Sequence, residues 1–202
     1  MQKNIKGLDL AVYGYHGFWP FPSGFDPVQG SYLFPSLNVY GLSAERGLLK
    51  GVLATEIGYY YSDDDPKGSD PLIRNSEFRA LINYSRDFKK GFSATLQYYV
   101  EIMSDYDTYL INAGSPQLNN HLDMITLRLT KLASKQRLRM SIFTFYGISN
   151  RDFYIRPQVS YKLSDYWKIE VGSNIFGGQN PFTFWNQFNS NNNFYLGLKW
   201  SV

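Results

Sequence analysis

The chain has 202 residues, a net charge of +3 and no cysteine. That length suits one domain, the missing cysteine excludes a disulfide scaffold or a thiolate metal site, and so small a charge does not indicate a nucleic-acid partner. Aromatic residues make up 18% of the chain and favour strands. No run approaches the roughly 18 apolar residues of a membrane helix. The N-terminus lacks the apolar stretch of a signal peptide, so we expect a mature chain or a fragment without its upstream strands.

Apolar and polar residues alternate with a period of two along most of the chain, and helical periodicity is weak. This alternation predicts ten strands, whose boundaries carry an error of about two to four residues. They cover residues 7–16, 36–44, 48–61, 76–88, 91–103, 121–132, 136–148, 152–163, 166–176 and 193–201.

The connections between the predicted strands fall into two classes. Short turns follow the second, fourth, sixth and eighth strands, at residues 44–47, 88–91, 133–135 and 164–165, and the seventh strand also ends in a short turn at 149–151. Longer polar or aromatic loops follow the first, third, fifth and ninth strands. Short turns on one side and long loops on the other are typical of outer-membrane barrels, in which strands of about ten residues cross the bilayer at a tilt.

Most of the predicted strands have one apolar face that carries no charge in mid-strand. A charge that faces lipid at the bilayer midplane costs about 2–4 kcal/mol, so a face of this kind is suited to lipid. The residues expected to face lipid are Leu96, Val100, Leu127, Ile142, Val159, Val171, Leu196 and Leu198.

The opposite face carries charges that a dry core could hold only as pairs, whereas a wet lumen holds them readily. Fixed charges set the ion preference of a wide pore, but in a barrel of only ten strands they would pair and fill the lumen. The sequence leaves both interpretations open. The residues expected to line the lumen are Glu56, Arg79, Glu101, Arg128, Arg139, Arg156, Lys168, Glu170 and Lys199.

Aromatic residues gather near the ends of the predicted strands, as expected at two membrane interfaces. A soluble β-sandwich or lipocalin-like barrel also alternates, but it turns its apolar face inward and needs no such belts. The sequence therefore predicts an all-β, antiparallel, up-and-down transmembrane β-barrel of about ten strands, as one domain over residues 1–202. The residues expected in the belts are Trp19, Tyr59, Tyr61, Tyr98, Tyr146, Tyr161, Trp167 and Trp200.

Three C-terminal motifs carry a resemblance to a known family. They are Asn174-Ile175-Phe176-Gly177-Gly178, Phe184-Trp185-Asn186-Gln187-Phe188 and Asn193-Phe194-Tyr195-Leu196-Gly197-Leu198-Lys199-Trp200. With Gly7-Leu8-Asp9-Leu10-Ala11 near the start, they resemble the C-terminal part of a family of large, mostly uncharacterised, porin-like outer-membrane proteins of Gram-negative bacteria. The resemblance implies further strands upstream and a last strand recognised by the barrel-assembly machinery. That machinery usually reads a terminal phenylalanine, which is Val202 here.

Catalysis and metal binding have few candidate residues. His16 and His121 fall near the loop ends of strands, where a hydrolase would need a His–Asp or Ser–His arrangement, but no spacing singles one out, so we expect no catalytic residue. The acidic loop 63–70 could hold Ca²⁺, but it lacks the full order of a calcium loop and its distal glutamate, so we expect no metal and no cofactor. Pro157 removes a ladder donor inside a strand and predicts a bulge or a seam.

Together these features favour a porin-like channel in a bacterial outer membrane, with membrane lipids and a small-molecule solute as partners. One alternative is a closed structural or adhesive barrel that binds a partner through its loops, and another is a hydrolase at the rim. The aromatic loop segments 18–22 and 182–188 could bind a sugar or an apolar solute, fold inward as a plug, or pack on the rim, which we expect.

Overall fold

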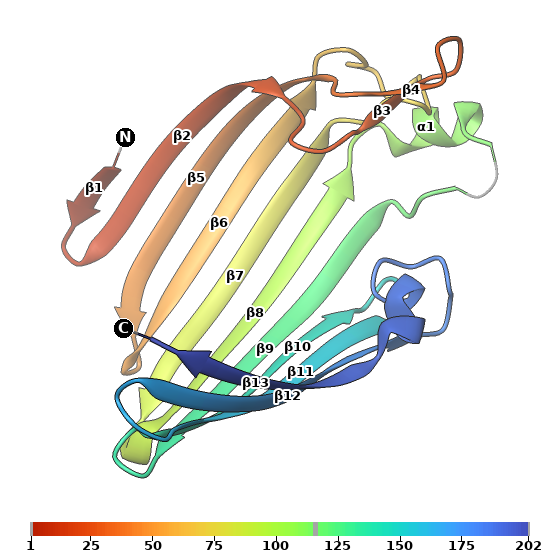
Figure 1. The fold of residues 1–202 in the computed structure, drawn as a ribbon. Helices are drawn as coiled ribbons and strands as arrows, with labels where there is room; N and C mark the ends of the chain where they lie inside the picture. The colour runs from red at the N-terminus through yellow and green to blue at the C-terminus, as the bar shows by residue number, and fades with distance from the viewer. Residues whose placement is uncertain (1, 115–116, 202) are drawn as a thin grey trace. The chain divides into compact units, whose positions relative to one another are not determined.

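A computed structural model describes residues 2–114 and 117–201. Val202, where the sequence departs from the usual terminal phenylalanine, lies outside the described residues. Eleven strands form one sheet in the order β1-β2-β5-β6-β7-β8-β9-β10-β11-β12-β13, and β3 pairs with β4 (Figure 1). The strands of the sheet are β1 (Gln2–Ile5), β2 (Leu8–Phe18), β5 (Ser36–Leu48), β6 (Gly51–Ser62), β7 (Glu77–Phe88), β8 (Phe92–Met103), β9 (His121–Ala133), β10 (Leu138–Gly147), β11 (Asp152–Lys162), β12 (Trp167–Gly178) and β13 (Asn193–Trp200).

The remaining elements lie in the connections. Strands β3 (Gly24–Asp26) and β4 (Ser31–Leu33) form a small hairpin after β2, and the helix α1 (Tyr106–Asn112) follows β8. Two 3₁₀ helices, η1 (Lys89–Gly91) and η2 (Asn186–Asn191), lie between β7 and β8 and between β12 and β13. No helix of the described residues is long and apolar enough to cross a membrane.

The ten predicted strands correspond to β2 and β5 to β13. The all-β antiparallel class is confirmed, and the long and short connections fall where they were predicted, with one correction. The turn predicted at residues 44–47 lies instead at Leu49 and Lys50, whose φ angles are 48° and 66°. Two adjacent residues with positive φ match the twist of a tight hairpin, and apolar-polar alternation cannot locate them.

Pro157 does not cause a bulge. The register between β11 and β12 keeps the same offset on both sides of it, from Ile155 opposite Ile175 to Gln158 opposite Gly172. Only the pairing of Arg156 and Pro157 with β12 is interrupted, while Pro157 still lies opposite Ile142 of β10. The proline therefore leaves a gap in one ladder, because a missing N–H removes a single donor without changing the path of the strand.

The chain divides into two compact units, which are described separately. The first comprises Met1–Arg46, Ala54–Ile82 and Tyr99–Leu122, and the second comprises Gly47–Leu53, Asn83–Tyr98 and Asp123–Val202. In the first unit β2 pairs with β5 over their whole facing length, and the β3–β4 hairpin and α1 lie at the loop ends of the strands (Figure 1). In the second unit β9 to β13 form an antiparallel meander joined by short turns and one longer loop.

Burial in the second unit is the reverse of that in a soluble domain. Its most buried side chains are all polar: Thr126, Asp152, Ser160, Glu170, Ser173 and Asn186. Its apolar residues are exposed or half-buried, and Val171 lies opposite both Val159 and Leu196 in an apolar band across three strands. A soluble sandwich would bury such a band, because burying apolar surface is the main favourable term in folding.

The eight residues expected to face lipid are all at least partly exposed. Val100 and Leu127 are half-buried, and the other six are exposed, with Leu196 exposed to 72%. Within the described residues the sheet has two edges, β1 and β13, each paired with a single neighbour. The described strands therefore form an open sheet, and the residues predicted for its apolar face are exposed or half-buried. Closure of this sheet into a barrel is a proposal.

Candidate functional site

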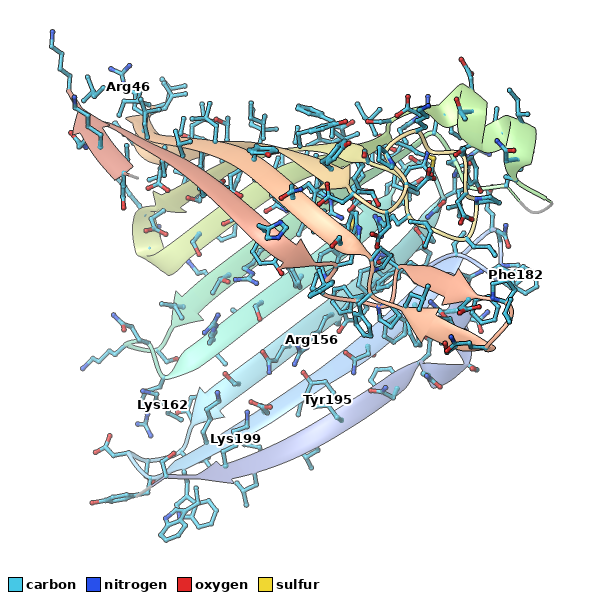
Figure 2. All side chains as sticks on the ribbon, turned by 90° about the horizontal axis from the view of Figure 1, so that it is seen from above. Arg46, Arg156, Lys162, Phe182, Tyr195 and Lys199 are labelled. Carbon is cyan, nitrogen blue, oxygen red and sulfur yellow. The ribbon has the colours of Figure 1, made fainter. Side chains whose placement is uncertain are left out.

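The polar face of β9 to β13 is built in rows that the strand register sets. Nearest the short turns, Lys162 lies opposite Lys168, and Lys168 lies opposite Lys199. In the next row Ser160 lies opposite Glu170. Two rows further toward the long loops, Phe143 lies between Arg128 and Arg156. Figure 2 shows Arg156, Tyr195 and Lys199 on these strands. We call this surface the basic face.

The basic face carries more positive than negative side chains. Its two acidic residues, Asp152 and Glu170, are buried, with exposed fractions of 1% and 8%. Six basic side chains share the face, so the imbalance is four charges. The six are Arg128, Arg139, Arg156, Lys162, Lys168 and Lys199.

Glu170 neutralises only the lysines beside it. Its carboxylate lies 3.5 Å from Nζ of Lys168 and 3.0 Å from Nζ of Lys199, and both lysine side chains remain partly exposed. Within the described residues neither Arg128, Arg139 nor Arg156 has a carboxylate within salt-bridge distance. The predicted lumen charges of this unit are therefore brought onto one surface and are only partly paired.

A tyrosine ring lies over a glycine in the middle of the basic face. Tyr195 of β13 lies opposite Gly172 of β12, and its ring occupies the space that a side chain at Gly172 would fill. A methyl group at Gly172 would lie 2.4 Å from the Tyr195 hydroxyl and 2.9 Å from the carbonyl oxygen of Pro157. The glycine is required because the ring passes directly over the backbone at this position.

An aromatic cluster covers the loop end of the basic face. Phe145, Tyr154 and Phe176 lie in one row on three adjacent strands, and the Tyr154 and Phe176 ring planes are 7° apart with centroids at 4.5 Å. Trp185, from the loop between β12 and β13, stacks on Phe145 at 4.9 Å and on Tyr154 at 5.2 Å. The loop therefore folds over the polar face, in contrast to the rim packing that we expected.

Buried polar groups hold this loop in place. The backbone N–H of Trp185 donates to a carboxylate oxygen of Asp152 at 2.9 Å, and Asn186 beside it is buried. Asp152 is the first residue of β11, so the loop is attached directly to the sheet. A carboxylate that accepts a backbone hydrogen bond in a buried setting is a strong positional restraint.

The first unit contains a different arrangement, which we call the arginine network. Arg74 donates to Glu77 at 2.9 Å and to Glu101 at 3.0 Å, and Arg79 donates from Nε to Glu77 at 2.5 Å and lies 3.6 Å from Glu101. Tyr99 donates its hydroxyl to Glu101 at 2.7 Å. Two arginines and two glutamates therefore neutralise one another, as in a salt-bridged filling.

Trp19 belongs to this network, and its predicted place in an exposed belt is wrong. Its side chain is only 3% exposed, stacks on Tyr60 at 5.9 Å, and has Arg74 over its ring at 4.9 Å. The chain turns back after β2, since the backbone N–H of Trp19 donates to the Pro35 carbonyl at 3.0 Å. The indole is therefore drawn under a guanidinium by cation–π attraction.

The other belt residues keep accessible positions. Trp167 and Trp200 lie opposite each other, are exposed to 42% and 63%, and have ring centroids 6.4 Å apart. The remaining members are exposed or half-buried, and they are Tyr59, Tyr61, Tyr98, Tyr146 and Tyr161.

A pocket of about 120 Å³ lies next to the arginine network in the first unit. Glu56, one of the predicted lumen residues, contributes to its wall together with Tyr13, Tyr60, Arg79 and Tyr99. All the residues that line this pocket belong to the first unit.

The predicted catalytic and metal candidates are used structurally. His16 Nδ1 lies 2.8 Å from the side-chain oxygen of Asn38, whose amide donates to Asp63 at 2.5 Å. Asp65 is buried and accepts from the N–H groups of Ser69 and Asp70, and Asp64 accepts from the backbone N–H of Ser36. The carboxylates of the acidic loop are therefore used in hydrogen bonds within the protein. No group of metal-ligating side chains occurs among the described residues.

Sequence reasoning missed four contributors to these surfaces. Arg74 lies in a long loop and Glu77 is the first residue of β7, so apolar-polar alternation does not assign either side chain to a face of the sheet. Trp185 is placed by a contact with Asp152, which is far away in sequence. Lys162 lies at a strand end, where its row with Lys168 depends on the register. Comparison with protein families, curated proteins and solved structures finds no match to this chain.

Proposed function

We propose that this chain spans a bacterial outer membrane as an antiparallel β-barrel, alone or with further strands, and that small solutes pass along its polar face. The observation that carries this proposal is the reversed burial of the second unit, where Glu170 and Ser160 are buried and Val171 and Leu196 are exposed. In a bilayer the apolar band meets lipid and the polar face meets water, so both faces are satisfied.

The edges of the sheet support the same proposal. Strands β1 and β13 each leave one row of backbone groups unpaired within the described residues. In hydrocarbon each unpaired group costs several kcal/mol, so a membrane sheet must close on itself or on added strands. The proposed barrel therefore requires both edges to be paired in the membrane.

Reconstitution into planar lipid bilayers tests this function. We expect the purified chain to require detergent or lipid for solubility and to produce stepwise ion currents. A chain that stays monomeric in buffer without detergent would contradict membrane insertion, and insertion without current steps would contradict solute passage.

A closed barrel is the second candidate, and the arginine network favours it. Four charges that pair with one another beside Trp19 and Tyr60 fill space without offering a free charge to a passing ion. A closed barrel would insert into lipid and conduct no current, and would instead present its long loops to a partner.

A further inference from the structure

We infer that the basic face selects small anions in which a carboxylate is attached to a six-membered ring. This inference rests on the proposed function and deepens it, because it names the class of solute that the second unit would take. The first observation is the charge imbalance of the face, with six basic side chains against two buried carboxylates. Such a surface concentrates anions and repels cations.

The second observation is that two arginines flank one phenylalanine in the strand register. Phe143 of β10 lies opposite Arg128 of β9 and Arg156 of β11, and the Arg128 guanidinium lies 4.6 Å from the Phe143 ring centroid. Strands are about 4.8 Å apart, so the two arginine backbones are about 10 Å apart. Both side chains are exposed.

This spacing suits a carboxylate. A guanidinium is planar and offers parallel N–H groups that match the two oxygens of a carboxylate. The Arg156 side chain interacts with the Tyr195 hydroxyl, so a carboxylate that accepts from both Arg128 and Arg156 would take the place of that hydroxyl. It would meet no competing acidic side chain, since Glu170 is already bound to Lys168 and Lys199.

The third observation is that aromatic side chains lie beside the arginines, where the ring of the anion would bind. The Phe143 ring lies 4.6 Å from the Phe145 ring in an edge-on contact, which joins the arginines to the aromatic cluster. Phe184, at the outer side of that cluster, is exposed to 62% and lies 4.7 Å from Trp185. A ring attached to the bound carboxylate would therefore meet aromatic side chains instead of water.

Two kinds of solute share this chemistry, namely aromatic acids and sugar acids. Both carry a carboxylate on a six-membered ring, and either the π face of an aromatic ring or the C–H groups of a sugar ring can stack on an aromatic side chain. Benzoate and glucuronate serve as the two probes, acetate tests the carboxylate alone, and benzyl alcohol tests the ring alone.

The experiment measures binding directly, so that it does not depend on conduction. Each probe is titrated against the full chain in detergent micelles, and binding is followed by saturation-transfer NMR on the probe. We expect benzoate or glucuronate to bind at least tenfold more tightly than acetate and than benzyl alcohol. The probe that binds more tightly shows whether the solute is an aromatic acid or a sugar acid.

Variants assign the binding to the two arginines. Arg128→Gln and Arg156→Gln are each expected to weaken binding of the better probe about tenfold, since a hydrogen bond to a charged group contributes that much. Arg156→Lys keeps the charge but loses the planar fork, so it should weaken binding as well. Lys131→Gln is the matched control, because Lys131 lies on β9 with its side chain bonded to the Lys90 carbonyl at 2.6 Å.

The outcomes separate this inference from the proposed function. Equal binding of acetate and benzoate, or full binding by Arg128→Gln with an unchanged circular dichroism spectrum, overturns the inference even if the chain conducts ions. Probe binding that depends on both arginines in a chain without current steps supports the inference and overturns the channel. Loss of binding in Lys131→Gln also overturns the assignment to the basic face.

Discussion

The indole of Trp185 lies nearly parallel to the phenol of Tyr154, with ring centroids 5.2 Å apart and planes 27° apart. One residue comes from the loop after β12 and the other from the polar face of β11. This contact places part of a long loop over the polar face of the second unit. In the proposed channel the loop is a constriction.

Replacing Trp185 with alanine is expected to release the loop. The side chain stacks on Phe145, Tyr154 and Phe176, and aromatic pairs contribute about 0.5–1.5 kcal/mol each, so the variant should lose about 2–4 kcal/mol of unfolding free energy. Single-channel conductance should rise because the constriction opens. The matched control is Phe182→Ala in the same loop, whose side chain is 92% exposed and should change neither quantity. Equal conductance in both variants would contradict an inward-folded loop.

Neutralising Glu77 is expected to destabilise the first unit. Its side chain is only 7% exposed and accepts from both Arg74 and Arg79, so Glu77→Gln leaves two arginines to share Glu101. Removing one partner of a buried ion pair is strongly destabilising, and because Arg74 is partly exposed we expect a loss of about 2–3 kcal/mol. Urea unfolding in lipid vesicles measures this loss.

Glu56→Gln is the control for that prediction. Glu56 is exposed and forms no salt bridge within the described part of the chain, so its loss should stay within about 0.5 kcal/mol. If the two variants unfold at the same urea concentration, the arginine network contributes nothing to stability and the closed-barrel candidate loses its support.

The sequence predicts the strands well because alternation is a local property. All ten predicted strands occur, and the residues assigned to the apolar side are exposed or half-buried. Short elements were missed for a physical reason. β1 has four residues and α1 has seven, which is too short for a period to show.

The candidate site was predicted only in part because its geometry depends on contacts between distant residues. Arg79 and Glu101 were both expected on the polar side, but their partner Arg74 is placed by loop bonds such as that from its N–H to the Ser23 carbonyl at 2.8 Å. Trp19 was misplaced for the same reason, since nothing local indicates that the chain turns back after β2. Alternation assigns a side, whereas loops decide which side chains meet.

Adding one methyl group at Gly172 is expected to disturb the basic face. In Gly172→Ala the new group would collide with the Tyr195 ring and lie 2.9 Å from the Pro157 carbonyl, so we expect a loss of about 1–3 kcal/mol. Tyr195→Ala in the same background should recover part of the loss, because the backbone clash persists. Gly47→Ala is the control, since a methyl group there meets nothing within 4 Å. Equal stabilities of Gly172→Ala and Gly47→Ala would show that Tyr195 does not lie over this glycine.

An arginine introduced at one of two adjacent positions of β11, Val159 or Gln158, tests which face of the sheet meets lipid. Val159 is 46% exposed and lies opposite Val171 and Met140, so Val159→Arg would place a charge in the apolar band. We expect it to lower the stability of the bilayer-inserted chain by about 2–4 kcal/mol. Gln158→Arg points to the basic face and should cost less than about 1 kcal/mol, because water reaches it there. Folding titrations in lipid vesicles compare the two variants. If Gln158→Arg is the more damaging change, the polar face is a closed interior, and neither a lipid-facing apolar band nor a solute path can be maintained.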